Sequence, residues 1–162
     1  MSNFFQRLDT LELSLAGKVF DMTFESTLAG LAVVYLQIKT GAKKPILLGY
    51  QLSSSAEPLL AEAFEAPTVT NGTTAITAYN LKRSSAITPT TLFYSDPTSV
   101  SGGTKIQTMV VTAGKGGGAV ATEMGAWQLN INTSYVWKIT NLTNQTTRVA
   151  GQIQFAEDYG TF

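Results

Sequence analysis

The residue types that most often carry enzyme chemistry are scarce in this sequence. Histidine and cysteine do not occur among its 162 residues. Their absence removes the commonest general base, the usual zinc ligands and every catalytic triad that depends on an imidazole. Three carboxylates lie close in sequence, at Glu57, Glu62 and Glu65, but their spacing suits a solvated strand or helix face as well as an acid–base pair across a cleft. The sequence therefore predicts no enzymatic activity and no metal or organic cofactor.

Two other groups of residues could bind a ligand, and each has a simpler interpretation. The run from Gly114 to Gly118 resembles a phosphate-binding loop, yet it lacks the Gly-Lys-Ser/Thr ending and the βαβ context. We predict a flexible loop there. Trp127, Tyr135, Trp137 and Phe155 could stack on sugars or bases, but they occupy the alternating apolar positions of predicted strands. We expect these four rings to lie in the core.

The balance of charge points away from nucleic acids and membranes. Eleven Lys and Arg residues balance eleven Asp and Glu residues, so no net field attracts nucleic acid or an anionic bilayer. No run of about 18 apolar residues is present to span a membrane. The first residues lack a secretory signal, so we expect synthesis in the cytoplasm. We also predict that Glu157 and Asp158 form a solubilising edge, and that the charge-poor surface favours self-association.

Composition and periodicity predict an all-β fold. The chain contains 23 Thr, 12 Ser and 7 Asn residues, which suit strands and turns. Apolar and polar residues alternate with period two over 127–131, 135–139 and 149–155, so we predict three strands in series, the last two forming a hairpin. Further short strands are predicted at 45–52, 75–81, 90–94 and 105–112. This pattern is typical of an antiparallel β-sandwich or barrel.

The chain divides into an arm and one domain. Residues 21–162 are predicted to form a single β-sandwich, because neither an internal repeat nor a linker interrupts them and their length suits one core. Residues 1–20 are predicted to be an amphipathic N-terminal arm, and their apolar residues fit a helix or a strand equally well. Residues 55–64 contain helix formers, but we favour a strand there.

The segment from Leu28 to Ile38 is predicted to form one continuous strand that is apolar on both faces. A two-layer sandwich buries only one face of each strand against its core, so the other face needs separate cover. We predict that the set Leu31, Val33 and Tyr35 is buried against a sister subunit, which would favour association through the apolar area removed from water. The alternative is that a loop or the N-terminal arm covers this set within one chain.

Four segments in a fixed order carry a resemblance to a known family. They are Asn71–Thr73, Asn80–Ser85, Gly102–Thr104 and Asn132–Leu142. The most specific part is the closing pattern Tyr-x-Trp-x-x-Thr-Asn before the last strand. Over residues 25–157 this layout resembles the β-rich head decoration, or cement, proteins of tailed bacteriophages.

The resemblance implies a function in assembly. It implies a jelly-roll-like sandwich, usually trimeric, that sits on the outside of a capsid and ties neighbouring major capsid subunits together, without a catalytic residue. We therefore expect a trimer, with a dimer as the alternative. The N-terminal arm is more apolar than expected of such a module, which leaves a tail or baseplate protein that binds a receptor or glycan as the alternative. We expect the arm to grip a capsid or neighbouring virion protein. The predicted interface residues are Phe4, Phe5, Leu8, Leu31, Val33 and Tyr35.

Overall fold

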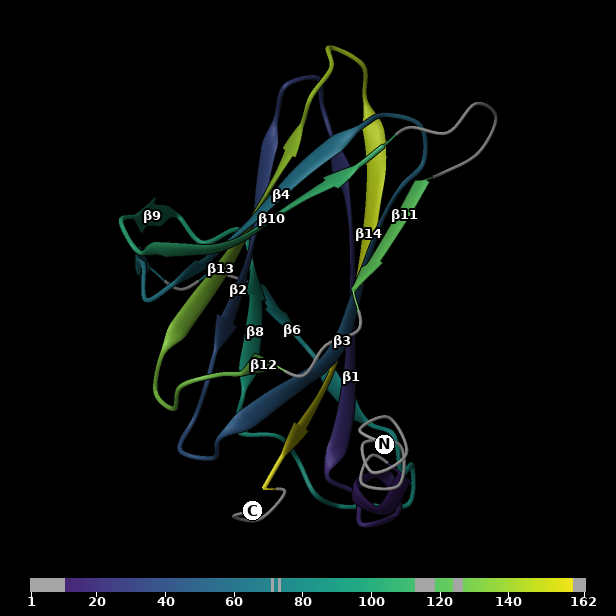
Figure 1. Cartoon of the computed structure of the whole chain (residues 1–162), viewed down its shortest axis with the longest axis vertical. Helices are drawn as coiled ribbons and strands as arrows, with labels where there is room; N and C mark the ends of the chain where they lie inside the picture. Colours follow the sequence, from purple (N-terminus) through teal and green to yellow (C-terminus); the bar gives the residue numbers. More distant parts are fainter. Residues whose placement is uncertain (1–10, 71, 73, 113–118, 124–126, 159–162) are drawn as a thin grey trace, which may run out of the picture.

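The computed structural model describes residues 11–70, 72, 74–112, 119–123 and 127–158. Two antiparallel sheets of six strands each form its layers, and a two-stranded sheet lies beside them (Figure 1). The all-β antiparallel sandwich predicted from the sequence is confirmed. Within the described ranges, no helix is long and apolar enough to cross a membrane.

Sheet A has the first and last long strands of the chain at its centre. Its strands are β1 (Val19–Leu28), β3 (Pro45–Ser54), β7 (Ala78–Asn80), β11 (Ala119–Glu123), β12 (Trp127–Gln128) and β14 (Thr147–Glu157). Their order is β11-β3-β14-β1-β7, and β12 pairs with β3. The register places Val19 opposite Ala156 and Leu28 opposite Thr147. Strands from the two ends of the chain therefore hold each other over their full length.

Sheet B forms the second layer. Its strands are β2 (Val33–Lys39), β4 (Leu59–Glu65), β6 (Thr74–Ile76), β8 (Leu92–Ser95), β10 (Thr104–Val111) and β13 (Ser134–Asn141). They follow the order β10-β4-β13-β2-β8-β6. The small third sheet pairs β5 (Thr68–Thr70) with β9 (Ser99–Ser101). A strand was predicted within residues 55–64, and β4 confirms this prediction for the second half of that range.

The chain crosses between the sheets at most connections between long strands. β13 pairs with β2 and β4 in sheet B, whereas β14 pairs with β1 and β3 in sheet A. The predicted hairpin between residues 135–139 and 149–155 is therefore wrong, and so is the three-stranded series, because β12 pairs with β3. Alternation along a strand reveals which face is buried but carries no information on which strand lies beside it.

The apolar segment 28–38 is interrupted by a turn, so the prediction of one continuous strand is wrong. Leu28 ends β1, and β2 begins only at Val33. Leu31 has a φ of 61°, in the left-handed region that a strand does not use. Gly30 packs so closely on the backbone of Asn144 that an added Cβ would lie within 2.2 Å of a carbonyl oxygen. This close approach between two turns requires glycine.

Inward side chains of both sheets form a core rich in aromatic rings. The prediction for the four aromatic residues is confirmed, since Tyr135, Trp137 and Phe155 are buried and Trp127 packs against them. The rings of Trp137 and Tyr50 meet edge to face with centroids 4.4 Å apart, a favoured arrangement for aromatic pairs. A second buried cluster of smaller residues continues the core.

A short helical turn leads into the sandwich. Residues 11–15 are helical, and the N–H of Lys18 donates to the carbonyl of Leu13 at 2.8 Å. Gly17 adopts a φ of 73°, as expected for glycine at a helix C-terminus with this bond pattern. The turn therefore ends where glycine permits the left-handed conformation.

The sandwich begins earlier than the sequence indicated. Val19 and Phe20 were assigned to the arm, yet both are buried residues of β1. Phe4, Phe5 and Leu8 lie outside the described residues, and so does the glycine run 114–118.

Candidate assembly surface

A line of mostly apolar residues crosses the outward face of sheet B. On β2, Val33 lies opposite Thr140 of β13. On β4, Leu60 lies between Thr140 and Val110 of β10. Because side chains alternate along a strand, Leu60 points outward while its buried neighbour Leu59 points into the core. Val33 is 39% exposed and Val110 is 53% exposed.

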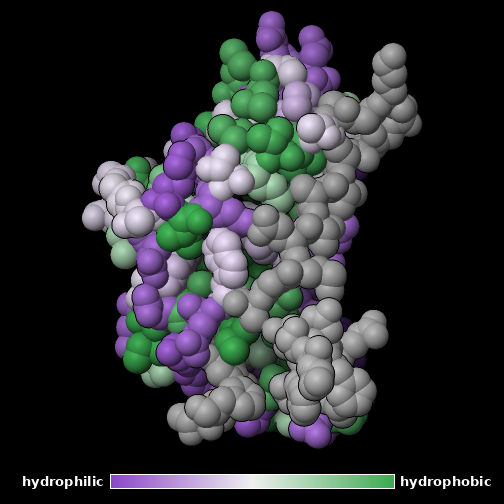
Figure 2. Space-filling model, in the orientation of Figure 1, coloured by the Kyte–Doolittle hydropathy of each residue, from purple (hydrophilic) through white to green (hydrophobic). Residues whose placement is uncertain are grey.

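Two turns extend this line at one end of the molecule. Leu31, between β1 and β2, is 65% exposed, and Leu142, between β13 and β14, is 44% exposed. The N–H of Leu31 donates to the carbonyl of Thr143 at 2.7 Å, which joins the two turns. In Figure 2 hydrophobic residues gather in the upper part of the view, where β4 and β10 run in Figure 1. We define the apolar surface as Leu31, Val33, Leu60, Val110 and Leu142.

The buried side chain of Asn141 fixes the turns that carry Leu31 and Leu142. Its Nδ2 donates to the carbonyls of Ala29 at 3.0 Å and Gln145 at 2.7 Å. Its Oδ1 accepts from the N–H of Thr143 at 3.1 Å, and its own N–H donates to the carbonyl of Ala32 at 3.0 Å. A fully bonded buried amide holds its neighbours in one arrangement, so the exposed leucines are presented on a rigid support.

A charged row borders the apolar surface. The Glu62 carboxylate lies 3.0 Å from Nζ of Lys105 and 3.7 Å from Nζ of Lys138. Half-buried Tyr35 lies opposite Lys138 in the register. Ion pairs this exposed add little stability, but an apolar centre beside a polar rim is the usual anatomy of a protein interface.

The structure places part of the predicted interface on this surface. Leu31 and Val33 belong to it, and Tyr35 lies in the next row. Leu60, Val110 and Leu142 were not predicted. A signal for two of them was present in the sequence, because Leu59-Leu60 and Val110-Val111 are consecutive apolar pairs, and a strand must turn one residue of such a pair outward.

The candidate carboxylates do not form an acid–base pair. Glu62 faces outward, whereas Glu65 accepts from the hydroxyl of Tyr135 at 2.7 Å and from Nδ2 of Asn130 at 2.9 Å. An odd separation along one strand places Glu62 and Glu65 on opposite faces. Among the described residues, no three His, Cys, Asp or Glu side chains gather as metal ligands.

The hydroxyl of Tyr135 is held in its protonated form. Burial is the main cause that raises the pKa of Tyr135 to about 12, and the bond and charge of Glu65 act in the same direction. The backbone N–H of Asn130, which donates to this hydroxyl at 2.9 Å, lowers the pKa. The hydroxyl thus serves as a donor that ties β13 to the end of β4.

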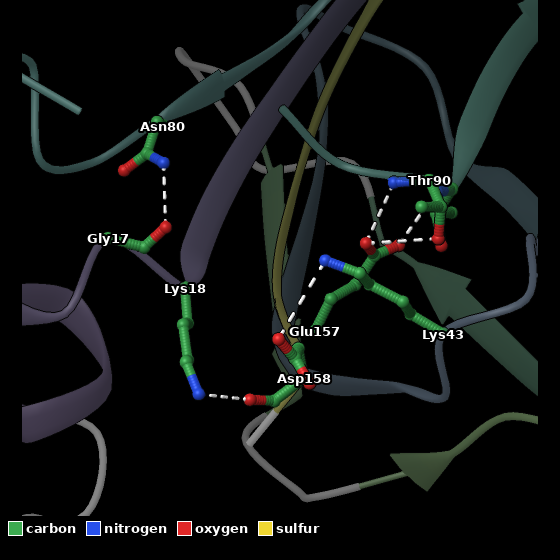
Figure 3. Close-up of polar contacts among 8 residues, drawn as sticks. Gly17, Lys18, Lys43, Asn80, Thr90, Glu157 and Asp158 are labelled. Carbon is green, nitrogen blue, oxygen red and sulfur yellow. Dashed lines mark hydrogen bonds and ion pairs between the residues drawn. The ribbon is translucent and has the colours of Figure 1, made fainter. Parts of the chain in front are cut away.

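Glu157 is not part of a solubilising edge, so that prediction is wrong for this residue. Only 2% of it is exposed, and its carboxylate accepts from the N–H of Thr90 and the N–H of Thr91, each at 2.7 Å (Figure 3). The Thr90 hydroxyl donates a third bond at 3.1 Å. Asp158 next to it is exposed and lies 3.8 Å from Nζ of Lys43. A buried carboxylate with three donors anchors the segment before β8.

Comparisons with known proteins leave the family of this chain open. No family model and no curated protein matches it. A mitogen derived from Yersinia pseudotuberculosis aligns with a TM-score of 0.38 and 13% identity, over 82% of this chain and 83% of that one. The VP2 protein of infectious bursal disease virus aligns with a TM-score of 0.21 and 12% identity, over 86% of this chain and 40% of that one. Similarities this weak assign no function.

Proposed function

We propose that this protein is a structural virion protein of a tailed bacteriophage that decorates the capsid and stabilises it by bridging neighbouring capsid subunits. The observation that carries the assembly part of the proposal is the apolar surface on sheet B, presented on turns that Asn141 holds rigid, whereas contact with the capsid is assigned to the N-terminal arm. Contiguous exposed apolar patches on soluble proteins mark sites of interaction. The chemistry of this surface therefore suits a protein partner.

The order of the long strands supports a role in a virion. Sheet A contains β1-β14-β3-β11 and sheet B contains β2-β13-β4-β10. This is the strand order expected of a jelly roll, in which eight strands form two Greek keys. Jelly rolls occur in viral capsid domains and also in lectins. The fold is therefore compatible with the proposal but does not distinguish it from other functions. The apolar surface is the feature that favours assembly.

The proposed oligomer is a trimer whose subunits meet at the apolar surface. A stable interface buries about 800 Å² on each partner, and apolar area contributes about 25 cal/mol per Å² before the costs of association are subtracted. Tyr35 and the charged row would lie at the rim. The N-terminal arm, with Phe4, Phe5 and Leu8, would reach the capsid.

Light scattering coupled to gel filtration tests the oligomer. We expect a trimer at micromolar concentration for the natural sequence and a monomer for Leu31→Asp. Asp tolerates the left-handed backbone of position 31 better than Leu does, so this change leaves the turn intact. Thr27→Asp, on the outward face of sheet A, is the matched control and should remain trimeric. A monomeric natural protein, or a trimeric Leu31→Asp variant, would contradict the proposed interface.

Immunogold electron microscopy tests the location. Antibody against this chain should label the heads of virions from the phage that encodes it. Labelling confined to tails or baseplates would favour the alternative, a receptor-binding module. Virions without any label would contradict both functions.

A further inference from the structure

The outward face of sheet A is hollowed at its centre. A shallow, open depression of about 430 Å³ lies over β1, β14 and β3. It belongs to the opposite sheet from the apolar surface. Two cross-strand rows of outward residues line it, and they are Glu25–Ala150–Ser53 and Thr23–Gln152–Gln51.

The hollow exists because small residues occupy its middle. Ala150 and Ser53 are short, while Glu25, Gln51 and Gln152 stand around them. Beside Ala150, Gly151 has no side chain, and the ring of Phe24 fills the space on the core side, since an added Cβ would lie 2.1 Å from that ring. Along the hollow, β14 is paired with β1 and β3, and β3 is paired with β11 as well, whereas β7 pairs with β1 only at Phe20–Met22. The floor is therefore fixed by the sheet itself, as a preorganised binding site requires.

Hydrogen bonds orient the polar groups around the hollow. Nε2 of Gln152 donates to Asp21 at 2.8 Å, and an amide used in this way retains an acceptor oxygen. The Ser53 hydroxyl donates to the carbonyl of Ala150 at 3.1 Å, and its oxygen retains acceptor capacity. Arg148 holds Glu25 at 3.0 Å. The amide of Gln51 and the hydroxyl of Thr23 add groups that can donate and accept.

We propose that this hollow binds a neutral carbohydrate. Donors and acceptors are interspersed over its walls, and a sugar hydroxyl both donates and accepts. Glu25, the one charged residue of the lining, forms an exposed ion pair with Arg148, and the lining contains no cationic side chain that would attract an anion. Ala150 and Phe24 give the lining apolar surface beside these polar groups, and the C–H face of a sugar ring can pack against such surface. This inference does not depend on the proposed assembly function.

Binding of neutral mono- and oligosaccharides on a glycan array, followed by calorimetry of those retained, tests this site. Ala150→Ile places a larger β-branched side chain at the centre of the hollow while keeping strand propensity. We expect at least a tenfold loss of affinity. Thr68→Ile, at an exposed position of β5 in the small third sheet, is the matched control and should bind as the natural sequence does.

A second variant keeps the proposal testable if Ala150→Ile fails to fold. Gln51→Ala removes an exposed amide from the wall, and we expect about a fivefold loss, the size of one neutral hydrogen bond. Retention of no neutral sugar by the natural protein would overturn the proposal. The proposal would also be overturned if the folded Ala150→Ile and Gln51→Ala variants bound the sugar with the same affinity as the natural protein. In all these variants the oligomeric state should stay unchanged, which separates this test from that of the assembly surface.

Discussion

The outward faces of the two sheets differ although the same core lies beneath both. Sheet B exposes Val33, Leu60 and Val110 in one line across its strands, whereas sheet A exposes Thr23, Gln152 and other polar side chains. Period-two alternation buries one face of each sheet and leaves the other face free to vary. The fold does not require apolar residues on the face of sheet B. Their presence is therefore better explained by a partner than by folding.

In each sheet a buried polar side chain anchors a neighbouring segment. In sheet A, Glu157 holds Thr90 and Thr91. In sheet B, Asn141 holds the turns that present Leu31 and Leu142. Only the second anchor lies under the apolar surface. Variants of the two anchors should therefore separate effects on stability from effects on association.

The largest loss of stability is expected for Glu157→Gln. The change replaces one carboxylate oxygen by an N–H group that faces a backbone donor, and a hydrogen bond to a charged group contributes about 1.5–3 kcal/mol. We expect the free energy of unfolding in urea to fall by about 3 kcal/mol. The oligomeric state of the folded fraction should be unchanged, and exposed Asp158→Asn is the matched control, with a change below about 0.5 kcal/mol. A silent Glu157→Gln variant would contradict the anchoring role.

Asn141→Ala should have a smaller effect on stability and a clear one on association. It leaves the carbonyls of Ala29 and Gln145 without this donor, and each such part-buried hydrogen bond contributes about 0.5–1.5 kcal/mol. We expect a loss of about 2 kcal/mol in urea denaturation. Because the turns then lose their fixed position, association measured by light scattering should weaken too. A loss of stability without any change in association would show that Leu31 and Leu142 need no rigid support.

Sequence reasoning recovered what depends on local alternation. The strands at 135–139 and 149–155 and the buried ring of Trp137 follow from period two. The pairing of those strands did not follow, because the next strand in sequence lies in the other sheet. The turn at Gly30 was hidden within an apolar run. The burial of Glu157 depends on backbone donors 66 and 67 positions away.

The outward faces of the two sheets also differ in how much of each could be predicted from the sequence. Leu31 and Val33 stood out because their segment is apolar on both faces. The hollow in sheet A gave no comparable signal, since Glu25, Ala150 and Ser53 become neighbours only through the register of three distant strands. Ordinary polar residues acquire a shared role only when the fold brings them together.

The stability that Tyr135 contributes to sheet B depends on pH. In sheet B the Tyr135 hydroxyl must keep its proton to donate to Glu65, and its pKa in the folded protein is about 12, against about 10 in an unfolded chain. Between these values the unfolded chain loses the proton first, so the stability due to this group is complete below pH 10 and is lost as pH rises toward 12. The loss is up to about 1.4 kcal/mol per pH unit.

Tyr135→Phe removes this titration. The difference in unfolding free energy between the natural protein and the variant should therefore narrow as pH rises from 10 to 12, in urea denaturation at fixed ionic strength. Thr68→Val, at an exposed position of β5 that carries no titrating group, is the control, and its difference from the natural protein should stay constant. A constant difference for Tyr135→Phe would show that the hydroxyl is not held protonated by the fold.

The smallest effect on stability, and the sharpest test of the contrast between the faces, is expected from exchanging their chemistry. In the double variant Val33→Thr and Val110→Thr, each residue stays β-branched and keeps its strand propensity, and water can solvate the new hydroxyls at these exposed positions. We expect stability to change by less than about 0.5 kcal/mol. Each lost methyl group removes about 0.8 kcal/mol of apolar burial from the assembled state, so two per subunit should weaken association about tenfold.

Thr23→Val with Thr27→Val is the converse exchange on sheet A. Because those apolar side chains would meet no complementary surface, association should be unchanged. If the sheet A variant gained association as readily as the sheet B variant lost it, any exposed apolar side chain on this sandwich would suffice, and the apolar surface would have no special role.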